Sequence, residues 1–304
     1  MMKRSLGEKI FNTFNITCMI IMCVAMLYPY LNAIALSFND GNDAAMGGIT
    51  IFPRKLTLMN YEMIFKNNLL MHAAVTSVLR VLGGTALGLI VITGAAYAMT
   101  RADLPGRSII QTYLIIPMFI AGGLIPNFIL FRTLGLMNNF FLYIFIINGS
   151  LGAFSVFNMV IVRTFFRTIP SSLEESAMID GANDIGIFWR IMLPLSKPVL
   201  ATIALWLAVG HWNDWVTSLY YIPQQNLWTL QYILMKIVKE AEMMQRMMAE
   251  NARLGMDTSR IRAAATSTTM QAATLICVTL PIILVYPSLQ KYFVRGVMIG
   301  AIKE

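Results

Sequence analysis

The chain has 304 residues, of which 57% are apolar and only 12% are charged, and its mean hydropathy is +0.66. Soluble domains carry roughly a quarter charged residues, so this composition excludes an ordinary soluble protein and indicates a polytopic membrane protein. The net charge of +8 does not indicate a nucleic-acid-binding protein, because the 23 Lys and Arg residues are scattered between apolar segments and form no single basic face.

The N-terminal apolar run, about residues 16–38, predicts the first membrane-spanning helix. Lys3, Arg4 and Lys9 precede it, and Ala33-Ile34-Ala35 imitates the cleavage site of a signal peptide. The run is nevertheless long enough to cross a bilayer, which takes roughly 20 residues. We therefore interpret it as a retained helix, followed by a polar external loop over residues 39–68.

Five further apolar segments predict the other spans, at about residues 69–100, 109–131, 140–162, 199–221 and 272–294. Twelve Lys and Arg residues fall at the two termini, in the turn from Arg101 to Arg107 and in the loop from Arg163 to Lys197. The two short loops on the other side carry four. Because short cytoplasmic loops are enriched in Lys and Arg, the sequence predicts an all-α protein with six transmembrane helices and both termini in the cytoplasm.

The long external loop, about residues 222–271, contains an amphipathic pattern. Apolar residues recur at helical spacing from Leu230 to Ala241. Lys236 with Glu240, and Glu242 with Arg246, are predicted to form ion pairs four residues apart on the polar side. The predicted external helix either lies as a lid on the bundle or docks an external partner, and the residues leave both open.

The cytoplasmic loop, about residues 165–198, predicts two short helices around a glycine turn. Its apolar residues either contact a partner or pack the end of the bundle, and physical reasoning alone does not choose. The helix signals, in chain order, are a capping box of Ser171 with Glu174 or Ser172 with Glu175, a stop at Gly181, a second cap at Asn183 or Asp184, and a second stop at Pro194 and Pro198.

The same loop resembles a known motif. Glu175-Ser176-Ala177, then Gly181, then Ile191-Met192-Leu193-Pro194 follow the spacing of the EAA loop of ATP-binding-cassette (ABC) importer permeases, with Ser176 where that family usually has alanine. Four stretches resemble the carbohydrate-uptake branch of the family, the maltose-type second permease: Asp180-Gly181-Ala182, Leu193-Pro194-Leu195-Ser196, Trp212-Asn213-Asp214-Trp215 and the tail from Gln290 to Lys303.

The resemblance implies one permease domain over residues 1–304 with the type I ABC importer fold, core helices at about residues 69–294 and cytoplasmic coupling helices. It places the protein in the bacterial cytoplasmic membrane. The implied partners are a second permease subunit, two copies of a cytoplasmic ATP-binding subunit and an external sugar-binding protein. The implied function is ATP-driven import of a saccharide, with an oligosaccharide favoured, and this chain forms half of the translocation pathway.

Two alternatives remain beside this function, a non-sugar solute and an ion-coupled secondary carrier. Of the fifteen Asp and Glu residues only Asp214 lies within a predicted span, which disfavours a proton relay. No catalytic residue and no metal ligand is expected. None of the nine lysines follows a glycine, as a phosphate-binding loop requires, so ATP and Mg²⁺ are expected in the partner ATPase and no cofactor in this chain.

Carried over residue by residue, the resemblance assigns ATPase coupling to the cytoplasmic loop. Within the set, Ile185, Phe188 and Trp189 are expected to make the contact itself, and the others to hold the shape of the loop. The predicted coupling residues are Glu175, Ala177, Asp180, Gly181, Ile185, Phe188, Trp189, Leu193 and Pro194.

The predicted substrate pathway is less sharply defined. Aromatic and hydrogen-bonding groups near the outer end of the fifth span suit a sugar, but they also suit an interfacial aromatic belt. An ionised Arg80 inside a span needs a partner, either Asp214 or an acidic group on the substrate, and we favour Asp214. Gly84 and Gly88 predict a close helix contact, and His211 a packing residue. The pathway candidates are Arg80, Asn148, Trp212, Asn213, Asp214 and Trp215.

Overall fold

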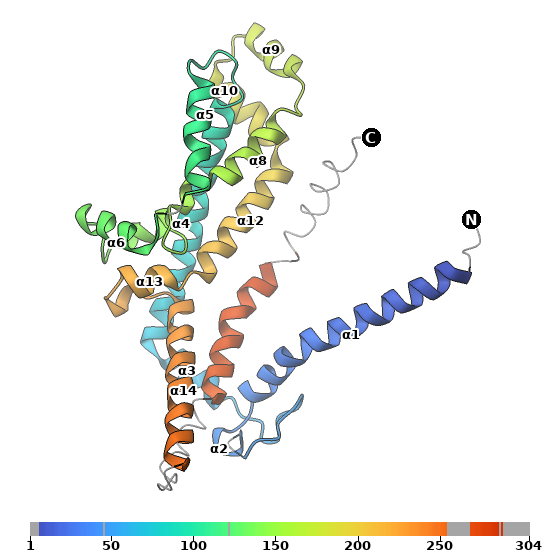
Figure 1. Ribbon diagram of the computed structural model, residues 1–304, viewed down its shortest axis with the longest axis vertical. Helices are drawn as coiled ribbons and strands as arrows, with labels where there is room; N and C mark the ends of the chain where they lie inside the picture. The colour runs from blue at the N-terminus through green and yellow to red at the C-terminus, as the bar shows by residue number, and fades with distance from the viewer. Residues whose placement is uncertain (1–5, 45, 121, 254–267, 286, 288–304) are drawn as a thin grey trace. The chain divides into compact units, whose positions relative to one another are not determined.

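The computed structural model of the protein describes residues 6–44, 46–120, 122–253, 268–285 and 287. The tail from Gln290 to Lys303 lies outside the described residues. Helices dominate the described ranges (Figure 1): α1 (Leu6–Ser37), α2 (Gly41–Ala44), α3 (Met59–Lys66), α4 (Asn68–Ala98), α5 (Arg107–Ile115), α6 (Leu124–Thr133), α7 (Phe140–Phe145), α8 (Val156–Phe166), α9 (Ser171–Ile179), α10 (Asp184–Ile187), α11 (Leu193–Leu195), α12 (Lys197–Asn213), α13 (Val216–Tyr221), α14 (Leu230–Arg253) and a further helix, Thr268–Val285.

Three of the described helices are long and apolar enough to cross a membrane: Gly7–Ser37, Asn68–Ala98 and Thr268–Val285. The first two coincide with the first and second predicted spans, and the third overlaps the last predicted span, 272–294, whose end lies outside the described residues. A fourth candidate is a broken one, in which Asp184–Leu195 and Lys197–Asn213 meet at an angle of 83°. Polypeptide in a bilayer must satisfy its own backbone hydrogen bonds, so such breaks need protein or water around them.

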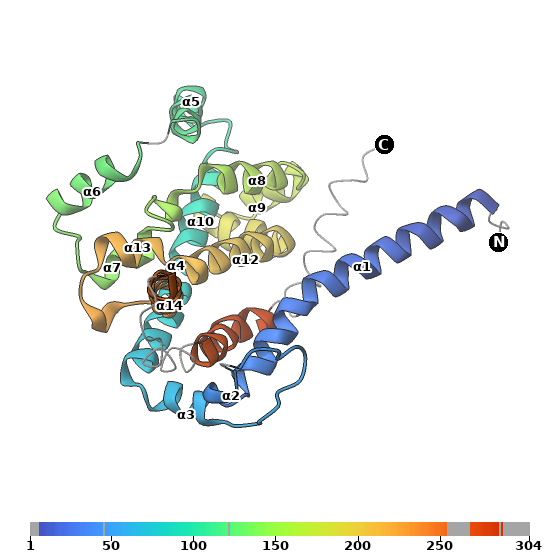
Figure 2. The same ribbon diagram turned by 60° about the horizontal axis from the view of Figure 1, so that its bottom comes forward.

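Three predicted spans are not continuous helices. Residues 109–131 form α5, a 3₁₀ turn at Ile116–Met118 and α6, because Pro117 cannot donate a backbone hydrogen bond. Residues 140–162 form α7, a short 3₁₀ turn and α8, with Asn148 and Gly149 at positive φ in between. The fifth span breaks where Asp214 takes up an extended conformation between α12 and α13. Figure 2 shows α5 and α6 at the margin of their bundle.

The chain forms two compact units. The first contains residues Met1–Asn68 and Leu234–Leu280, and the second contains Leu69–Ile233 and Pro281–Glu304. Helix α14 is longer than the amphipathic segment predicted from the sequence. Its predicted Lys236–Glu240 pair is present at 3.8 Å, whereas Glu242 pairs with Lys239 at 3.0 Å in place of the predicted Arg246.

In the first unit, polar side chains hold the loop that follows α1, over residues 38–58. Asn39 donates to the Asp43 carboxylate at 2.9 Å and accepts from the Lys55 amide at 2.8 Å. Asn60 donates to the Ser37 carbonyl at 2.9 Å and accepts from the Thr269 hydroxyl at 3.1 Å. The loop therefore has a defined conformation fixed by amide side chains, which the sequence showed only as polar.

The ion pair between Arg54 and Asp43, at 3.0 Å, completes this loop. The hydrogen bond from Asn39, together with the hydrogen bond and charge of Arg54, outweighs the effect of burial and lowers the pKa of Asp43 below its ordinary value. The fold thus favours the ionised carboxylate.

In the second unit, α4 and α12 approach each other closely. A side chain at Gly84 would place its Cβ 2.2 Å from the His211 Nε2 atom, and one at Gly88 would lie 2.9 Å from Leu207 Cδ1. The structure therefore confirms the predicted small-residue contact, and it packs the buried His211 against Gly84.

An apolar core fixes the end of this bundle where α9 and α10 lie (Figure 1). It takes residues from α4, α8 and α12 and from residues 171–195, which carry α9 and α10. The fully or nearly fully buried members include Ile92, Ala96, Met159, Val162, Phe166, Ala177, Ile187, Met192, Ile203 and Leu207.

Candidate functional site

Helix α9 begins directly after Pro170, whose fixed backbone sets the first turn. No side chain caps this end, so the predicted capping box is wrong. The helix ends as predicted, because Gly181 has a φ of +83°, a conformation that residues with a Cβ rarely adopt. The Ala182 amide then donates to the Ala177 carbonyl at 2.9 Å, which closes the turn.

Helix α10 is capped by Asn183, whose side chain accepts from the Gly186 amide at 2.8 Å, one of the two predicted caps. The helical segment then runs through a π turn, Phe188–Met192, and ends at Leu195. The helix thus passes Pro194, since the wide turn before it accommodates the missing amide and the bulk of the ring, and it ends before Pro198, between the two prolines predicted to stop it. The sharp bend follows, before α12.

Large apolar side chains on α9, on α10 and in the π turn that follows α10 face outward. Ile179 is 87% exposed, Ile185 69% and Trp189 57%. Phe188 is half-buried and its ring lies 5.3 Å from that of Tyr97. We call Ile179, Ile185 and Trp189 the exposed apolar patch. Ile179 was missed from the sequence, although it lies two residues after the buried Ala177 and so on roughly the opposite face of its helix.

The other predicted coupling residues divide by exposure. Ala177 is buried in the core and Leu193 is half-buried, so these two attach the loop to the bundle. Four are exposed: Glu175, Asp180, Gly181 and Pro194. The predicted set therefore contains both residues that face the core and residues that face away from it.

A second feature missed from the sequence is the role of Arg101, which the sequence shows only as one of the basic residues in the turn from Arg101 to Arg107. Its guanidinium pairs with Glu174 of α9 at 3.0 Å and with Asp184 of α10 at 2.7 Å, and it lies 5.8 Å from the Tyr97 ring centroid. Burial lowers the pKa of Arg101, but Tyr97 and the neighbouring carboxylates raise it overall. No local sequence signal could pair residues more than 70 positions apart.

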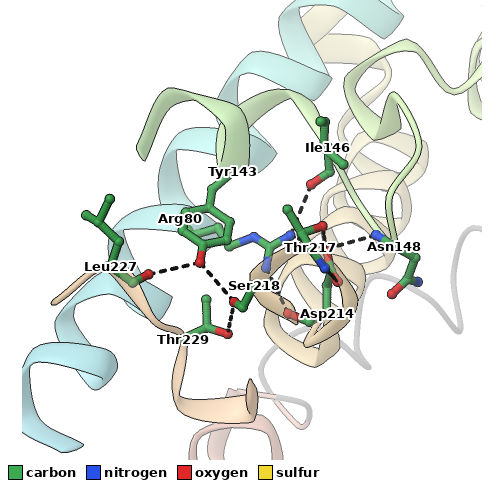
Figure 3. Close-up of polar contacts among 9 residues, drawn as sticks. All are labelled: Arg80, Tyr143, Ile146, Asn148, Asp214, Thr217, Ser218, Leu227 and Thr229. Atoms are coloured by element: carbon green, nitrogen blue, oxygen red, sulfur yellow. Dashed lines mark hydrogen bonds and ion pairs between the residues drawn. The ribbon is translucent and has the colours of Figure 1, made fainter. Parts of the chain in front are cut away.

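Arg80 and Asp214 form a fully buried ion pair in the second unit (Figure 3). Arg80 also donates to the backbone carbonyls of Asp214 at 2.8 Å and Ile146 at 3.0 Å, and its guanidinium carbon lies 4.7 Å from the Tyr143 ring centroid. The structure thus makes the pairing that we favoured. Both partners face protein, and no charge is presented to a ligand.

Further donors complete the Asp214 carboxylate (Figure 3). The carboxylate accepts from the backbone amide of Asn148 at 2.8 Å. It also accepts from the hydroxyl of Thr217 at 2.5 Å and from the backbone amide of Thr217 at 3.0 Å. Beside it, the Tyr143 hydroxyl contacts Ser218 and the Leu227 carbonyl, each at 2.9 Å. The break between α12 and α13 is therefore held by a polar network that reaches α4 and the α7–α8 connection.

The remaining pathway candidates lie in different surroundings. The Asn148 and Asn213 side chains are exposed, and that of Trp215 is half-buried. Trp212 lines an apolar pocket of about 230 Å³ with Val78 and Leu205. Within the described ranges, no cluster of three or more His, Cys, Asp or Glu side chains is placed to hold a metal ion.

Comparison with known proteins places this arrangement in a family. Residues 84–299 match the model of the "binding-protein-dependent transport system inner membrane component". A polygalacturonan/rhamnogalacturonan transport system permease protein, YtcP of Bacillus subtilis (strain 168), is 33% identical over 285 residues, covering 94% of this chain and 95% of the relative. Protein LplC of the same organism is 34% identical over 302 residues, covering 99% and 98%.

A solved structure agrees with the sequence relatives. It is a bacterial ABC transporter involved in the import of the acidic polysaccharide alginate, whose matching chain is 28% identical, with a TM-score of 0.82 over 96% of this chain and all of that one. The protein thus belongs to the family of binding-protein-dependent transport inner membrane components: it is a non-catalytic, multi-pass inner-membrane permease subunit of an ABC importer.

Proposed function

We propose that this chain forms half of the translocation pathway of an ATP-driven saccharide importer, and that α9 and α10 dock a cytoplasmic ATPase. The observation that carries the proposal is the exposed apolar patch of Ile179, Ile185 and Trp189, in a segment that the buried Ala177 and Ile187 attach to the core. Large apolar side chains held in water by a rigid support are typical of protein contact sites.

Rigid attachment makes this patch suitable for transmitting force. Ala177 and Ile187 are buried in the same core as residues of α4, α8 and α12. A partner that displaces α9 and α10 would therefore move the bundle as one body, because packed interiors deform little. Closure of two ATPase subunits on this element would switch the cavity between inward-facing and outward-facing arrangements.

The energy source in this proposal lies in partner subunits. The assembly would comprise this chain, a second permease, two copies of an ATP-binding subunit that hold ATP and Mg²⁺, and an external saccharide-binding protein. The membership of the family in binding-protein-dependent systems supports this composition.

Six crossings with cytoplasmic termini fit the charge distribution of the loops. In this topology the interrupted segments α5–α6, α7–α8 and α12–α13 each supply one crossing, beside α1, α4 and the helix Thr268–Val285. The same topology puts α9 and α10 in the cytoplasm and α14 outside, and it makes residues 1–304 one permease domain.

An oligosaccharide is the substrate that the relatives support. Similar permeases are named for polygalacturonan/rhamnogalacturonan, for galactooligosaccharides (30% identical) and for maltodextrin (27% identical), and the similar structure belongs to an importer of an acidic polysaccharide. The buried pairing of Arg80 gives this chain no free cation at that point for a substrate carboxylate, so selectivity for charge would rest mainly on the external binding protein.

The proposal is tested by uptake in cells with and without the chain. Labelled oligogalacturonides, alginate oligosaccharides, galactooligosaccharides and maltodextrins are supplied singly, and uptake is measured before and after ATP depletion and after collapse of the proton gradient. We expect uptake of at least one oligosaccharide class to need both the chain and ATP. Uptake that persists without ATP and stops with the proton gradient would instead show an ion-coupled carrier.

A further inference from the structure

Arg101 joins three separate elements of the second unit. It lies in the turn between α4 and α5, and it reaches Glu174 on α9 through Nη1 and Asp184 on α10 through Nη2. The two carboxylates are therefore held by different nitrogens of one planar group. Arginine suits this task because its donors point in fixed, divergent directions, which the single ammonium of lysine does not offer.

The contact is shielded enough to matter energetically. The Arg101 side chain is 19% exposed and that of Glu174 22%, so water screens this pair less than a surface ion pair. The Asp184 side chain is 61% exposed, which makes it the weaker partner. Arg101 and Glu174 are mostly buried and Asp184 is exposed to solvent, so the three side chains lie at the edge of the core.

Apolar packing does not fill this region. A cavity of about 380 Å³ is lined by Tyr97, Arg101, Asp184, Ile185 and Phe188, between the end of α4 and the start of α10. Ala177 and Ile187 anchor the inner faces of the two short helices. Glu174 and Asp184 lie three positions before Ala177 and Ile187, and so on the same side of α9 and of α10. Their contacts with Arg101 join that side to the α4–α5 turn and so fix the direction of the opposite, exposed side.

The turn that carries Arg101 is itself secured. Arg163 of α8 donates from Nε to the Met99 carbonyl at 3.0 Å, and Arg107 donates to the Arg101 carbonyl at 3.0 Å. Arg101 is thus a firm extension of α4. The same helix carries Arg80, which lies 21 positions earlier and hence about 30 Å away along the axis at 1.5 Å per residue.

We propose that Arg101 is a positioning residue that holds α9 and α10 to the end of α4. A displacement of the exposed apolar patch then passes directly along α4 to the Arg80–Asp214 pair. The inference rests on the proposed coupling function of α9 and α10. It adds a route through α4, which is not adjacent in sequence to the coupling loop.

The attachment of α9 and α10 to α4 is tested by electron paramagnetic resonance distances in the assembled complex, purified through a tag on this chain. Cys18, Cys23 and Cys277 are replaced by serine, and spin labels are placed at Ala102 and Ser172, both exposed. We expect one narrow distance distribution for the parent protein, a clearly broader one for Arg101→Gln and an intermediate one for Arg101→Lys. Arg167→Gln, at an exposed arginine that ends α8, is the matched control and should stay narrow.

Transmission of the displacement along α4 is tested with a second pair of spin labels. They are placed at Leu79 on α4 and Leu219 on α13, which are 51% and 43% exposed. ATP, Mg²⁺ and vanadate should shift this distance in the parent protein. In Arg101→Gln we expect the shift to shrink by about twofold or more, the effect of losing a coupling contact of ordinary strength, while the ATPase still co-purifies. The double variant Glu174→Gln/Asp184→Asn should reproduce that loss from the other side.

Two results would overturn the proposal: an unchanged width for the Ala102–Ser172 pair in Arg101→Gln, or a full nucleotide-induced shift of the Leu79–Leu219 pair in that variant. Failure of the proposed function gives a different pattern. In that case no ATPase co-purifies with the parent protein, and its Leu79–Leu219 distance does not change when nucleotide is added. The width of the Ala102–Ser172 distance distribution still decides whether Arg101 holds α9 and α10 to α4.

Discussion

Arg80 and Asp214 stand 134 positions apart in the chain, yet they form an ion pair in which neither side chain has any solvent exposure. Such a pair is costly to bury and is stable only when its remaining donors and acceptors are satisfied. Here the backbone carbonyls of Asp214 and Ile146 and the donors Asn148 and Thr217 satisfy most of them. The pair therefore fixes the break between α12 and α13 relative to α4.

Removing one partner of this pair should destabilise the protein strongly. Arg80→Met or Asp214→Leu alone leaves a buried charge without its counterion, at a cost of about 3–5 kcal/mol. The double variant Arg80→Met/Asp214→Leu removes both charges and should recover much of that loss. The midpoint of thermal unfolding of the purified complex measures each variant, and a double variant less stable than both single variants would contradict the structural role.

The contact between α4 and α12 gives a prediction with a control on the same helix. Gly84→Ala forces a methyl group onto the His211 ring, and we expect a loss of roughly 1–3 kcal/mol from overpacking. Gly94→Ala meets no atom within 4 Å and should be neutral or slightly stabilising, by up to about 1 kcal/mol. Thermal unfolding of both variants decides the point, and equal midpoints would show that the helices separate easily.

The glycine turn between α9 and α10 should tolerate asparagine better than valine. At the φ of +83° of Gly181, a residue with a Cβ is strained by roughly 1–2 kcal/mol, but asparagine adopts this region more readily than other residues. Gly181 has open space around it, so the effect is conformational. We expect Gly181→Val to lower ATP-driven uptake more than Gly181→Asn.

Gly135 supplies the matched control for that turn. It follows α6 with a φ of +67° and also has no atom within 4 Å of an added Cβ. Gly135→Val should therefore carry a similar local strain without disturbing the ATPase contact. If Gly135→Val and Gly181→Val reduce uptake equally, the effect of Gly181 is general instability and the coupling interpretation is wrong.

The loop after α1 should loosen in acid. The pKa of Asp43 is lowered in the folded state, chiefly by the hydrogen bond from Asn39, so the stabilisation is complete above the ordinary value near 3.8 and is lost as pH falls through the lower folded value. Hydrogen exchange of residues 39–55, corrected for intrinsic rates, should show less protection below that value than at neutral pH. Asp43→Asn should remove the pH dependence, and its persistence would exclude Asp43 as the cause.

The sequence was informative where a signal is local. Apolar length predicted α1 and α4, the glycine at position 181 predicted the end of α9, and the small residues Gly84 and Gly88 predicted a close helix contact, whose partner the structure shows to be α12. Each of these depends on a few neighbouring residues and on general rules of helix geometry.

The features that escaped prediction depend on distant residues or on backbone details. Apolar composition could not show that the third, fourth and fifth spans break, because Pro117, Asn148 and Asp214 sit within hydrophobic surroundings. The bridge from Arg101 to Glu174 and Asp184 exists only once the end of α4 meets α9 and α10. The outward direction of Ile179 followed from helix periodicity but needed the buried position of Ala177 as a reference.

The role of the exposed apolar patch in docking an ATPase is tested most directly by the ATPase activity that co-purifies with a tagged form of this chain from its native membrane. We predict that the parent protein brings down an ATPase and a second permease, and that Ile185→Asp, which places a charge on the exposed apolar patch, loses most of that activity while inserting normally. Ile51→Asp is the same change in the loop after α1, at a residue that is 42% exposed, and it should keep that activity. Full ATPase recovery with Ile185→Asp would contradict the assignment of α9 and α10 as the ATPase-docking element.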